Sequence, residues 1–337
     1  MRAAARVRAT VGKAATSLPN LTKRDLLSIG DLSRADCDEI FALSKTLKAA
    51  VRAKRTHRRL EGRAMAMIFE KPSLRTRVTF EIGISQLGGT AVYLAPGDIR
   101  LGERESVPDI ARNLSRWVDL IVARTFAHET VRGLAVNATV PVINALSDWE
   151  HPCQVLADIF TLIERRRKLA GLKVAFVGDG NNMVHSWMLA ASLLDIEFRL
   201  ACPPGYEPDP QIVAAVRHVP RSRITITHSV ADAVRGADVL YTDVWTSMGQ
   251  EAEAANRREA FRGYQLNAST VLQAAPGALV MHCLPAHRGD EITGDVLDGP
   301  QSVVLDQAEN RLHVQKAIMV WLTARGRGST GGAKRRA

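Results

Sequence analysis

Short apolar runs alternate with amphipathic stretches along the whole chain. The runs have the length of buried strands, and they are Ala64–Phe69, Ala91–Leu94, Leu120–Ala123, Val140–Asn144, Lys173–Val177, Phe198–Cys202, Ile224–Thr227, Val239–Thr242 and Ala278–Cys283. The stretches between them have helical spacing, as at Val78, Ile82 and Gln86. This alternation predicts an α/β fold of parallel sheets flanked by helices.

One helical pattern, from about Cys153 to Leu169, is longer than most and divides the chain. A chain of 337 residues is typical of two domains. We therefore expect two domains, each a parallel sheet flanked by helices, joined by a long interdomain helix. The expected parts are a disordered tail (1–24), a first domain (25–152), a second domain (153–306), a C-terminal helix returning to the first domain (307–324) and a second disordered tail (325–337).

The net charge of +10 comes from the two ends of the chain. Residues 1–24 carry six Lys or Arg and no acid, and residues 325–337 carry five and no acid. Without these eleven charges the body is near neutral, at −1. Such tails predict disorder rather than a specific nucleic-acid surface. The arginine-rich start fits a solvated tail on a cytoplasmic protein, which we favour, or a mitochondrial transit peptide.

Other bulk features exclude several classes of protein. No apolar run reaches the roughly 18 residues of a membrane span. The four cysteines lie far apart without a C-x-x-C pair, which argues against a zinc site or a disulfide framework.

The segment Phe69–Phe80 has the pattern of a phosphate site. A strand ends, Pro72 forces a turn, and Ser73 stands where a helix N-cap belongs. A helix N-terminus offers free N–H groups and a positive dipole, and Arg75 and Thr76 add further donors. The alternative is an ordinary capped helix with surface arginines.

Polar residues at the start of the long helix and after two strands are further candidates. His151 and Gln154 flank the helix start beside the expected interdomain cleft, a favoured place for ligands. Asp243 follows the strand Val239–Thr242, where it could hold a substrate ammonium. Cys283 ends another strand and is either a packed thiol or one with a lowered pKa. A helix cap is the alternative for His151 and for Asp243.

A glycine turn after the strand Lys173–Val177 resembles part of a dinucleotide fingerprint. Gly178 and Gly180 fit G-x-G-x-x-G, but Met183 occupies the third glycine position, and Glu197 lies before its strand rather than after it. A nicotinamide-dependent dehydrogenase is therefore a weak alternative. Asn182 at this turn could instead hold a small carboxylate.

Taken together, four segments in this order resemble the aspartate/ornithine transcarbamylase family over about residues 25–325. Ser73-Leu-Arg-Thr76 resembles its S-x-R-T loop, and His151-Pro-Cys-Gln154 resembles its H-P-x-Q motif. The loop from Asp243 to Gly249 and His282-Cys-Leu-Pro285 are similar to the D-x-x-x-S-M-G and H-C-L-P motifs of the ornithine branch.

The resemblance implies transfer of a carbamoyl group from carbamoyl phosphate, bound by the first domain, to ornithine, bound by the second. It implies that carbamoyl phosphate is held by Ser73, Leu74, Arg75, Thr76, Arg100, Arg124, His151, Gln154, Cys283, Leu284 and Arg311. It implies that ornithine is held by Asn182, Asp243, Ser247 and Met248. The residues expected to act in catalysis are Arg75, Arg124, His151, Asp243 and Cys283.

The resemblance also implies a homotrimer or a multiple of trimers, with the active site shared across a subunit interface. No metal and no organic cofactor is expected. Two positions depart from the family pattern: Leu74 stands where Thr is common, and Arg100 where Gln or His is common. The alternatives left open are a transferase for another amine, such as putrescine or an acylated ornithine, and a nucleic-acid-binding protein supported by the tails alone.

Overall fold

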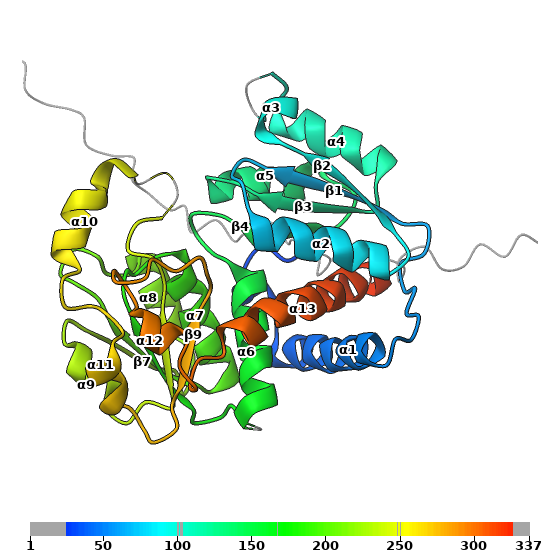
Figure 1. The fold of residues 1–337 in the computed structure, drawn as a ribbon. Helices are drawn as coiled ribbons and strands as arrows, with labels where there is room; N and C mark the ends of the chain where they lie inside the picture. The colour runs from blue at the N-terminus through cyan, green and yellow to red at the C-terminus, as the bar shows by residue number, and fades with distance from the viewer. Residues whose placement is uncertain are drawn as a thin grey trace, which may run out of the picture.

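The computed structural model describes residues 25–99, 101, 104–166, 168–247, 249 and 251–325. Both basic ends, 1–24 and 326–337, lie outside the described residues, so their disorder stays a prediction. Two parallel sheets, each flanked by helices, form two lobes (Figure 1). The predicted fold class is therefore confirmed. Among the described residues, no helix is both long and apolar enough to span a membrane.

The first sheet has the strand order β2-β1-β3-β4. Its strands are β1 (Ala64–Phe69), β2 (Thr90–Leu94), β3 (Leu120–Arg124) and β4 (Val142–Leu146), and its surrounding helices are α1 (Arg34–Arg52), α2 (Leu74–Gln86), α3 (Pro96–Ile99), α4 (Val107–Trp117) and α5 (His128–Asn137), with a short 3-10 helix η1 (Ile29–Asp31). The prediction placed β4 two residues too early. Pro141 has no N–H to give to a ladder, although its carbonyl accepts from Ile121 at 2.9 Å, and the regular strand begins after it.

The second sheet has the strand order β7-β6-β5-β8-β9. Its strands are β5 (Lys173–Val177), β6 (Glu197–Ala201), β7 (Arg223–Thr227), β8 (Val239–Thr242) and β9 (Leu279–His282). The helices of this half are α7 (Asn182–Leu194), α8 (Pro210–Arg217), α9 (Val230–Val234), α10 (Ala254–Ala260), α11 (Ala268–Leu272) and α12 (Gly294–Leu297), with the 3-10 helix η2 (Glu251–Glu253). In both sheets the strand order reverses beside the first strand, and ligand sites of parallel sheets favour such switch points.

Two helices connect the lobes. Helix α6 (Pro152–Arg166) runs between them, and α13 (Val304–Arg325) packs against α6 and then against α1 and α2 of the first lobe (Figure 1). Their buried faces belong to one hydrophobic cluster that includes Phe69 of the first sheet and Phe176 of the second. The two sheets therefore share a continuous core through α6 and α13.

The apolar stripe that predicted α2 does not face this core. Val78 and Ile82 are 46% and 45% exposed, and Leu74, one turn before Val78, is 74% exposed. The buried face of α2 is instead made by Thr76, Phe80, Gly83 and Ile84. Periodicity thus predicted the helix correctly but gave no indication of which side is covered.

The glycine turn after β5 packs against the backbone of residues 206–208. The Gly180 N–H donates to the Tyr206 carbonyl at 2.9 Å. A Cβ at position 180 would lie 2.4 Å from the Pro208 nitrogen. The backbone beside this glycine is already occupied by the 206–208 loop, which removes the close approach that a dinucleotide pyrophosphate needs at a fingerprint glycine.

We expect Gly180→Ala to lower the free energy of unfolding by about 1–3 kcal/mol, because the added methyl must push the 206–208 backbone away. Denaturant unfolding of purified protein measures the change. Gly97→Ala is the matched control, since a Cβ there meets no atom of the described residues within 4 Å, and it should be neutral or slightly stabilising. An unchanged midpoint for Gly180→Ala would contradict the packing argument.

Candidate active site

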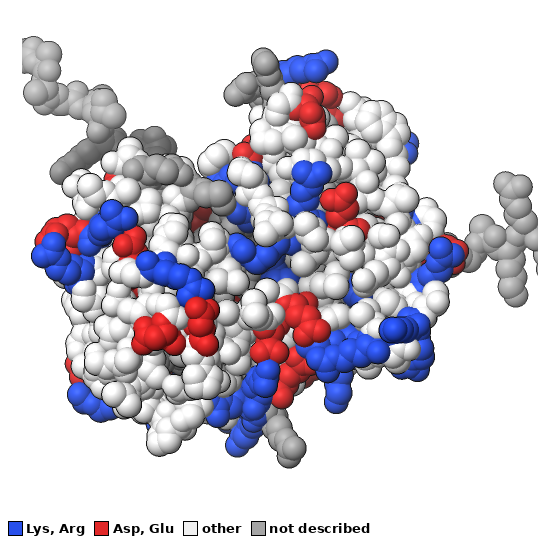
Figure 2. Space-filling model, viewed as in Figure 1, with Lys and Arg blue, Asp and Glu red and all other residues white. Residues whose placement is uncertain are grey.

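A cleft of about 800 Å³ lies where the carboxyl ends of strands from both sheets meet. Every predicted site residue that the structure describes lines it, namely Ser73, Leu74, Arg75, Thr76, Arg124, His151, Gln154, Asn182, Asp243, Ser247, Cys283, Leu284 and Arg311. Arg100 and Met248 lie outside the described residues. In the space-filling view, Lys and Arg atoms are exposed between the two lobes (Figure 2).

The first wall of the cleft is built on the N-terminus of α2. Ser73 caps this helix, and its hydroxyl accepts from the Thr76 N–H at 3.3 Å. Arg311 reaches this wall from α13 and donates to the Thr76 hydroxyl at 3.1 Å and to the side-chain oxygen of Gln154. A residue 235 positions away thereby completes the site that the 69–80 segment predicts.

Three guanidinium groups and one imidazole gather on this wall. Arg124 ends β3, is 5% exposed, and its Nε has no hydrogen-bond partner among the described residues. None of the ion pairs between described residues involves Arg75, Arg124 or Arg311. Clustered guanidinium groups without a salt-bridge partner form a site for an anion.

Burial and these neighbouring charges together determine the protonation of the site. Burial, and then the neighbouring Arg311 and Arg75, lower the pKa of Arg124 to about 10. Burial, and then Arg311, Arg124 and Arg75, lower the pKa of His151 well below its ordinary value. His151 is therefore a neutral imidazole at physiological pH, and one of its ring nitrogens carries a hydrogen that can be donated.

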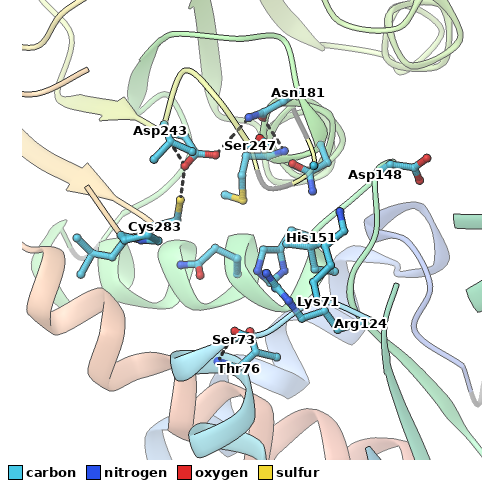
Figure 3. Close-up of a pocket in the computed structure, with 18 of the residues that line it drawn as sticks. Lys71, Ser73, Thr76, Arg124, Asp148, His151, Asn181, Asp243, Ser247 and Cys283 are labelled. Atoms are coloured by element: carbon cyan, nitrogen blue, oxygen red, sulfur yellow. Dashed lines mark hydrogen bonds between the residues drawn. The ribbon is translucent and has the colours of Figure 1, made fainter. Parts of the chain in front are cut away.

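The opposite wall presents a carboxylate, a thiol and an amide (Figure 3). The Cys283 thiol donates to Asp243 Oδ1 at 2.9 Å, and Asn181 donates to Asp243 Oδ2 at 3.2 Å. Burial, and then Asp243, raise the pKa of Cys283 well above its ordinary value. The sulfur is thus a protonated hydrogen-bond donor, which does not suit a covalent nucleophile.

The backbone at the end of β9 is held in an uncommon conformation. Leu284 has φ of +58° and precedes a cis peptide bond to Pro285. Its N–H donates to His282 Nδ1 at 2.8 Å, and His282 Nε2 lies 3.0 Å from Glu291 Oε1. A positive φ at a leucine costs of order 1–2 kcal/mol. The buried His282–Glu291 pair stabilises this conformation beside Cys283.

The ligand atoms of Asp243, His282 and Cys283 lie within 4.8 Å of one another, close enough for a metal ion. However, one ring nitrogen of His282 accepts from Leu284 and the other faces Glu291. A metal here would have to break one of these bonds, so the group is better described as a hydrogen-bonded cluster than as a metal site.

Several residues of the site were not identified in the sequence. Asn181, not Asn182, caps α7 and contacts Asp243, whereas Asn182 donates to the Ser147 carbonyl at 2.6 Å. Arg257 forms an ion pair with Asp179 at 2.8 Å and donates to the Trp245 carbonyl at 3.1 Å, which ties the loop after β8 to the glycine turn. An asparagine directly before a helix was a usable signal for a cap, but no local pattern relates Arg257 to Asp179.

Glu150 supports the His151 segment from a fully buried position. Its Oε2 accepts from Ile29 N–H and from the Ser186 hydroxyl, both at 3.0 Å, and the same hydroxyl accepts from His151 N–H at 2.9 Å. Among the described residues, its Oε1 has no partner. Burial raises the pKa of Glu150 to about 7, against hydrogen bonds that lower it.

Two family descriptions match this chain and together cover most of it. "Aspartate/ornithine carbamoyltransferase, carbamoyl-P binding domain" matches residues 24–164. "Aspartate/ornithine carbamoyltransferase, Asp/Orn binding domain" matches residues 170–322. The first match contains the α2 wall of the cleft and the second contains the Asp243 wall.

Individual proteins are similar over nearly the same span. The chain is 52% identical to an ornithine carbamoyltransferase of Chlorobaculum tepidum, covering 89% of this chain and 90% of the relative. It is 50% identical to one of Methanoculleus marisnigri, covering 91% and 99%. The solved structure of an ornithine carbamoyltransferase from Pyrococcus furiosus has a TM-score of 0.86 and 49% identity, covering 89% of this chain and 96% of that one.

The raised pKa of Glu150 predicts a stability that falls as pH rises. The folded state holds the proton up to about pH 7, whereas the unfolded chain releases it near the ordinary value of 4.5. The stabilising contribution is complete below pH 4.5 and is lost through pH 7, and its full size is about 3 kcal/mol. In Glu150→Gln this dependence is absent, so the variant should gain up to that amount relative to wild type between pH 5 and 8.

Denaturant unfolding at several pH values measures this difference. Glu259→Gln is the control, because Glu259 is 68% exposed in a surface pair with Arg262, and it should follow the wild-type curve. Parallel curves for wild type and Glu150→Gln would show that Glu150 does not titrate in this range.

Proposed function

The chain belongs to the aspartate/ornithine carbamoyltransferase family, and we propose from this premise that it is an ornithine carbamoyltransferase. It transfers the carbamoyl group of carbamoyl phosphate to the δ-amine of L-ornithine, giving L-citrulline and phosphate, as a step of arginine metabolism. The observation that carries the proposal is a wall of three guanidinium groups and a neutral histidine facing Asp243 across one cleft. The first wall suits a phosphate and an acyl oxygen, and the second suits an α-ammonium.

Carbamoyl phosphate binds on the α2 wall in this proposal. The capped N-terminus of α2, Arg75, Thr76 and Arg124 hold the phosphate, and Arg311 closes the pocket. Arg124, Thr76 and the neutral His151 polarise the carbonyl oxygen, which gains negative charge when the amine attacks. Each such donor is typically worth about 10²–10³ in rate. Gln154 and the Leu284 carbonyl accept from the carbamoyl NH₂.

Ornithine binds second, on the opposite wall. Asn182 and the Met248 N–H hold its α-carboxylate, and Asp243 with Ser247 holds its α-ammonium. Fixing this end aims the δ-amine at the carbonyl carbon, and such placement can supply up to about 7–11 kcal/mol of the barrier.

The proton and the leaving group are both accounted for without a further reactant. The δ-ammonium releases one proton to solvent before attack, and Cys283, donating to Asp243, lies beside the expected path of the amine and modulates this loss. Nitrogen then bonds to the carbonyl carbon, the bond from carbon to the phosphate oxygen breaks, and the departing phosphate accepts the remaining proton.

We also propose how the protein assembles and where it is located. It forms a homotrimer or a multiple of trimers, in which Arg100 reaches the site of a neighbouring subunit. Its location is cytoplasmic. The exposed stripe of Leu74, Val78 and Ile82 on α2, with the half-exposed Val92 on the adjacent edge strand, offers an apolar surface for a second copy. Light scattering tests this point: a mass of three chains that falls in Ile82→Asp supports it, and a monomeric wild type overturns it.

The experiment that tests the reaction is product formation from carbamoyl phosphate with ornithine, aspartate or putrescine in parallel. We expect citrulline with ornithine and no product with the other two. The wall around Asp243 offers a counter-charge to the α-ammonium of an amino acid, which putrescine lacks, and aspartate has no second amine to reach the carbamoyl carbon. Product with another amine would support the binding of carbamoyl phosphate on the α2 wall but overturn the assignment of ornithine to the Asp243 wall. No product from folded protein would overturn both.

Arg75→Ala should reduce turnover by more than 10²-fold with the fold intact, because it removes a charged donor from the phosphate and the developing oxyanion. Steady-state rates and a thermal melt measure the two quantities. Arg77→Ala is the matched control: it lies on the same helix, is half-exposed over the Tyr93 ring, and does not line the cleft. Normal turnover in Arg75→Ala would overturn the assignment of the phosphate loop.

A further inference from the structure

Asp158, on α6, is a carboxylate that the proposed reaction does not use, and its burial is unusual. It is completely buried, and no ion pair between described residues involves it. Its partners are neutral: Gln154 Nε2 at 2.8 Å and Gln307 Nε2 at 3.0 Å on Oδ1, and the Tyr241 hydroxyl at 2.8 Å on Oδ2. A buried charge without a cationic partner is costly, so its presence calls for a role that an apolar side chain does not fill.

The chemistry of its neighbours fixes the orientation of the Gln154 amide. Arg311 can only donate hydrogen bonds and an ionised Asp158 can only accept them. Gln154 lies between the two, with its oxygen on Arg311 and its nitrogen on Asp158. The reversed amide would place two donors together at one end and two acceptors at the other. The Gln154 side chain therefore points its oxygen, and not its NH₂, toward Arg311 and the part of the cleft that Arg311 lines.

Asp158 fixes a second amide that leads to the other side of the site. The nitrogen of Gln307 donates to Asp158, and its oxygen accepts from the backbone N–H of His282 at 3.0 Å. His282 in turn accepts from the Leu284 N–H at 2.8 Å. One carboxylate thus holds the Gln154 amide directly, through its nitrogen, and the backbone at His282 through one intermediate, Gln307.

We propose that Asp158 is a positioning residue that presents two hydrogen-bond acceptors, Gln154 Oε1 and the backbone at Leu284, to the NH₂ of the carbamoyl group. It thereby selects a carbamoyl donor over an acyl phosphate that has a methyl group in place of the NH₂. This inference rests on the proposed function, in which these two acceptors bind the carbamoyl nitrogen.

The expected selectivity follows from the cost of unpaired acceptors. A site built to receive an N–H leaves its buried acceptors without partners when the ligand lacks that group, and such sites discriminate strongly. Acetyl phosphate is the matched probe, since it keeps the phosphate and the carbonyl and replaces NH₂ by CH₃. It should bind the wild-type site much more weakly than carbamoyl phosphate does.

The test compares the KM for carbamoyl phosphate with the Ki of acetyl phosphate as a competitive inhibitor, at saturating ornithine. In Asp158→Ala we expect KM to rise about tenfold or more while Ki stays within about twofold, because only the NH₂ contacts lose their orientation. The Ki of inorganic phosphate should also be unchanged. If the alanine variant does not fold, Asp158→Thr fills most of the same space with a hydroxyl too short to reach both amides.

Two further variants separate positioning from general stability. Asp158→Asn can turn its oxygen toward both glutamines and its NH₂ toward the Tyr241 hydroxyl, so it should restore the wild-type ratio of Ki to KM. Tyr241→Phe removes a hydrogen bond to the same carboxylate but leaves both amides held, and it should also keep that ratio. Thermal melts show how far each variant is destabilised.

The outcomes are distinct. A ratio that falls in Asp158→Ala or Asp158→Thr and returns in Asp158→Asn supports the proposal. KM and both Ki values rising together would show a merely structural role, and an unchanged ratio in the alanine and threonine variants would show no role at all, so either overturns it. Absence of citrulline from the wild type would instead overturn the proposed function on which the inference rests.

Discussion

Repulsion between like charges is the constraint under which this cleft is built. Arg75, Arg124 and Arg311 come from three separate elements and converge without a salt bridge to any carboxylate of the described residues. Such an arrangement destabilises the folded chain, and the continuous core through α6 and α13 has to offset the cost. Burial, together with these same charges, keeps His151 neutral. The cleft is thus suited to bind an anion, and binding one relieves the repulsion.

Much of this architecture could be predicted because it depends on local patterns. The strands Ala64–Phe69, Lys173–Val177 and Val239–Thr242 have the bounds that their apolar runs predicted. Parallel strands bring their carboxyl ends to one edge, so motifs that follow strands were expected to lie together, as Ser73 and Asp243 do. Those parts of the site required no knowledge of how the elements pack against one another.

The remaining parts depend on contacts between residues distant in the sequence. In the sequence, Asp158 is one polar residue within a largely apolar helix. Its role depends on α13, which brings Gln307 to Asp158 and Arg311 to Gln154. The stripe containing Val78 predicted α2 correctly, but its exposure depends on which neighbours cover the helix. The sequence does not show that the neighbouring residues Asn181 and Asn182 have different partners. Asn181 caps α7 and contacts Asp243, whereas Asn182 donates to the Ser147 carbonyl.

The position of Arg311 on α13, late in the sequence, also determines when the site can be complete during protein synthesis. Ribosomes make the chain from its N-terminus, and domains fold as they emerge. Strands β1 to β9 and nearly every residue of the cleft are therefore made before α13. A nascent chain, or one truncated by premature termination, lacks the guanidinium that joins Thr76 to Gln154. Synthesis of α13 is thus a precondition for the complete anion site, and a fragment that ends before α13 lacks one of its three guanidinium groups.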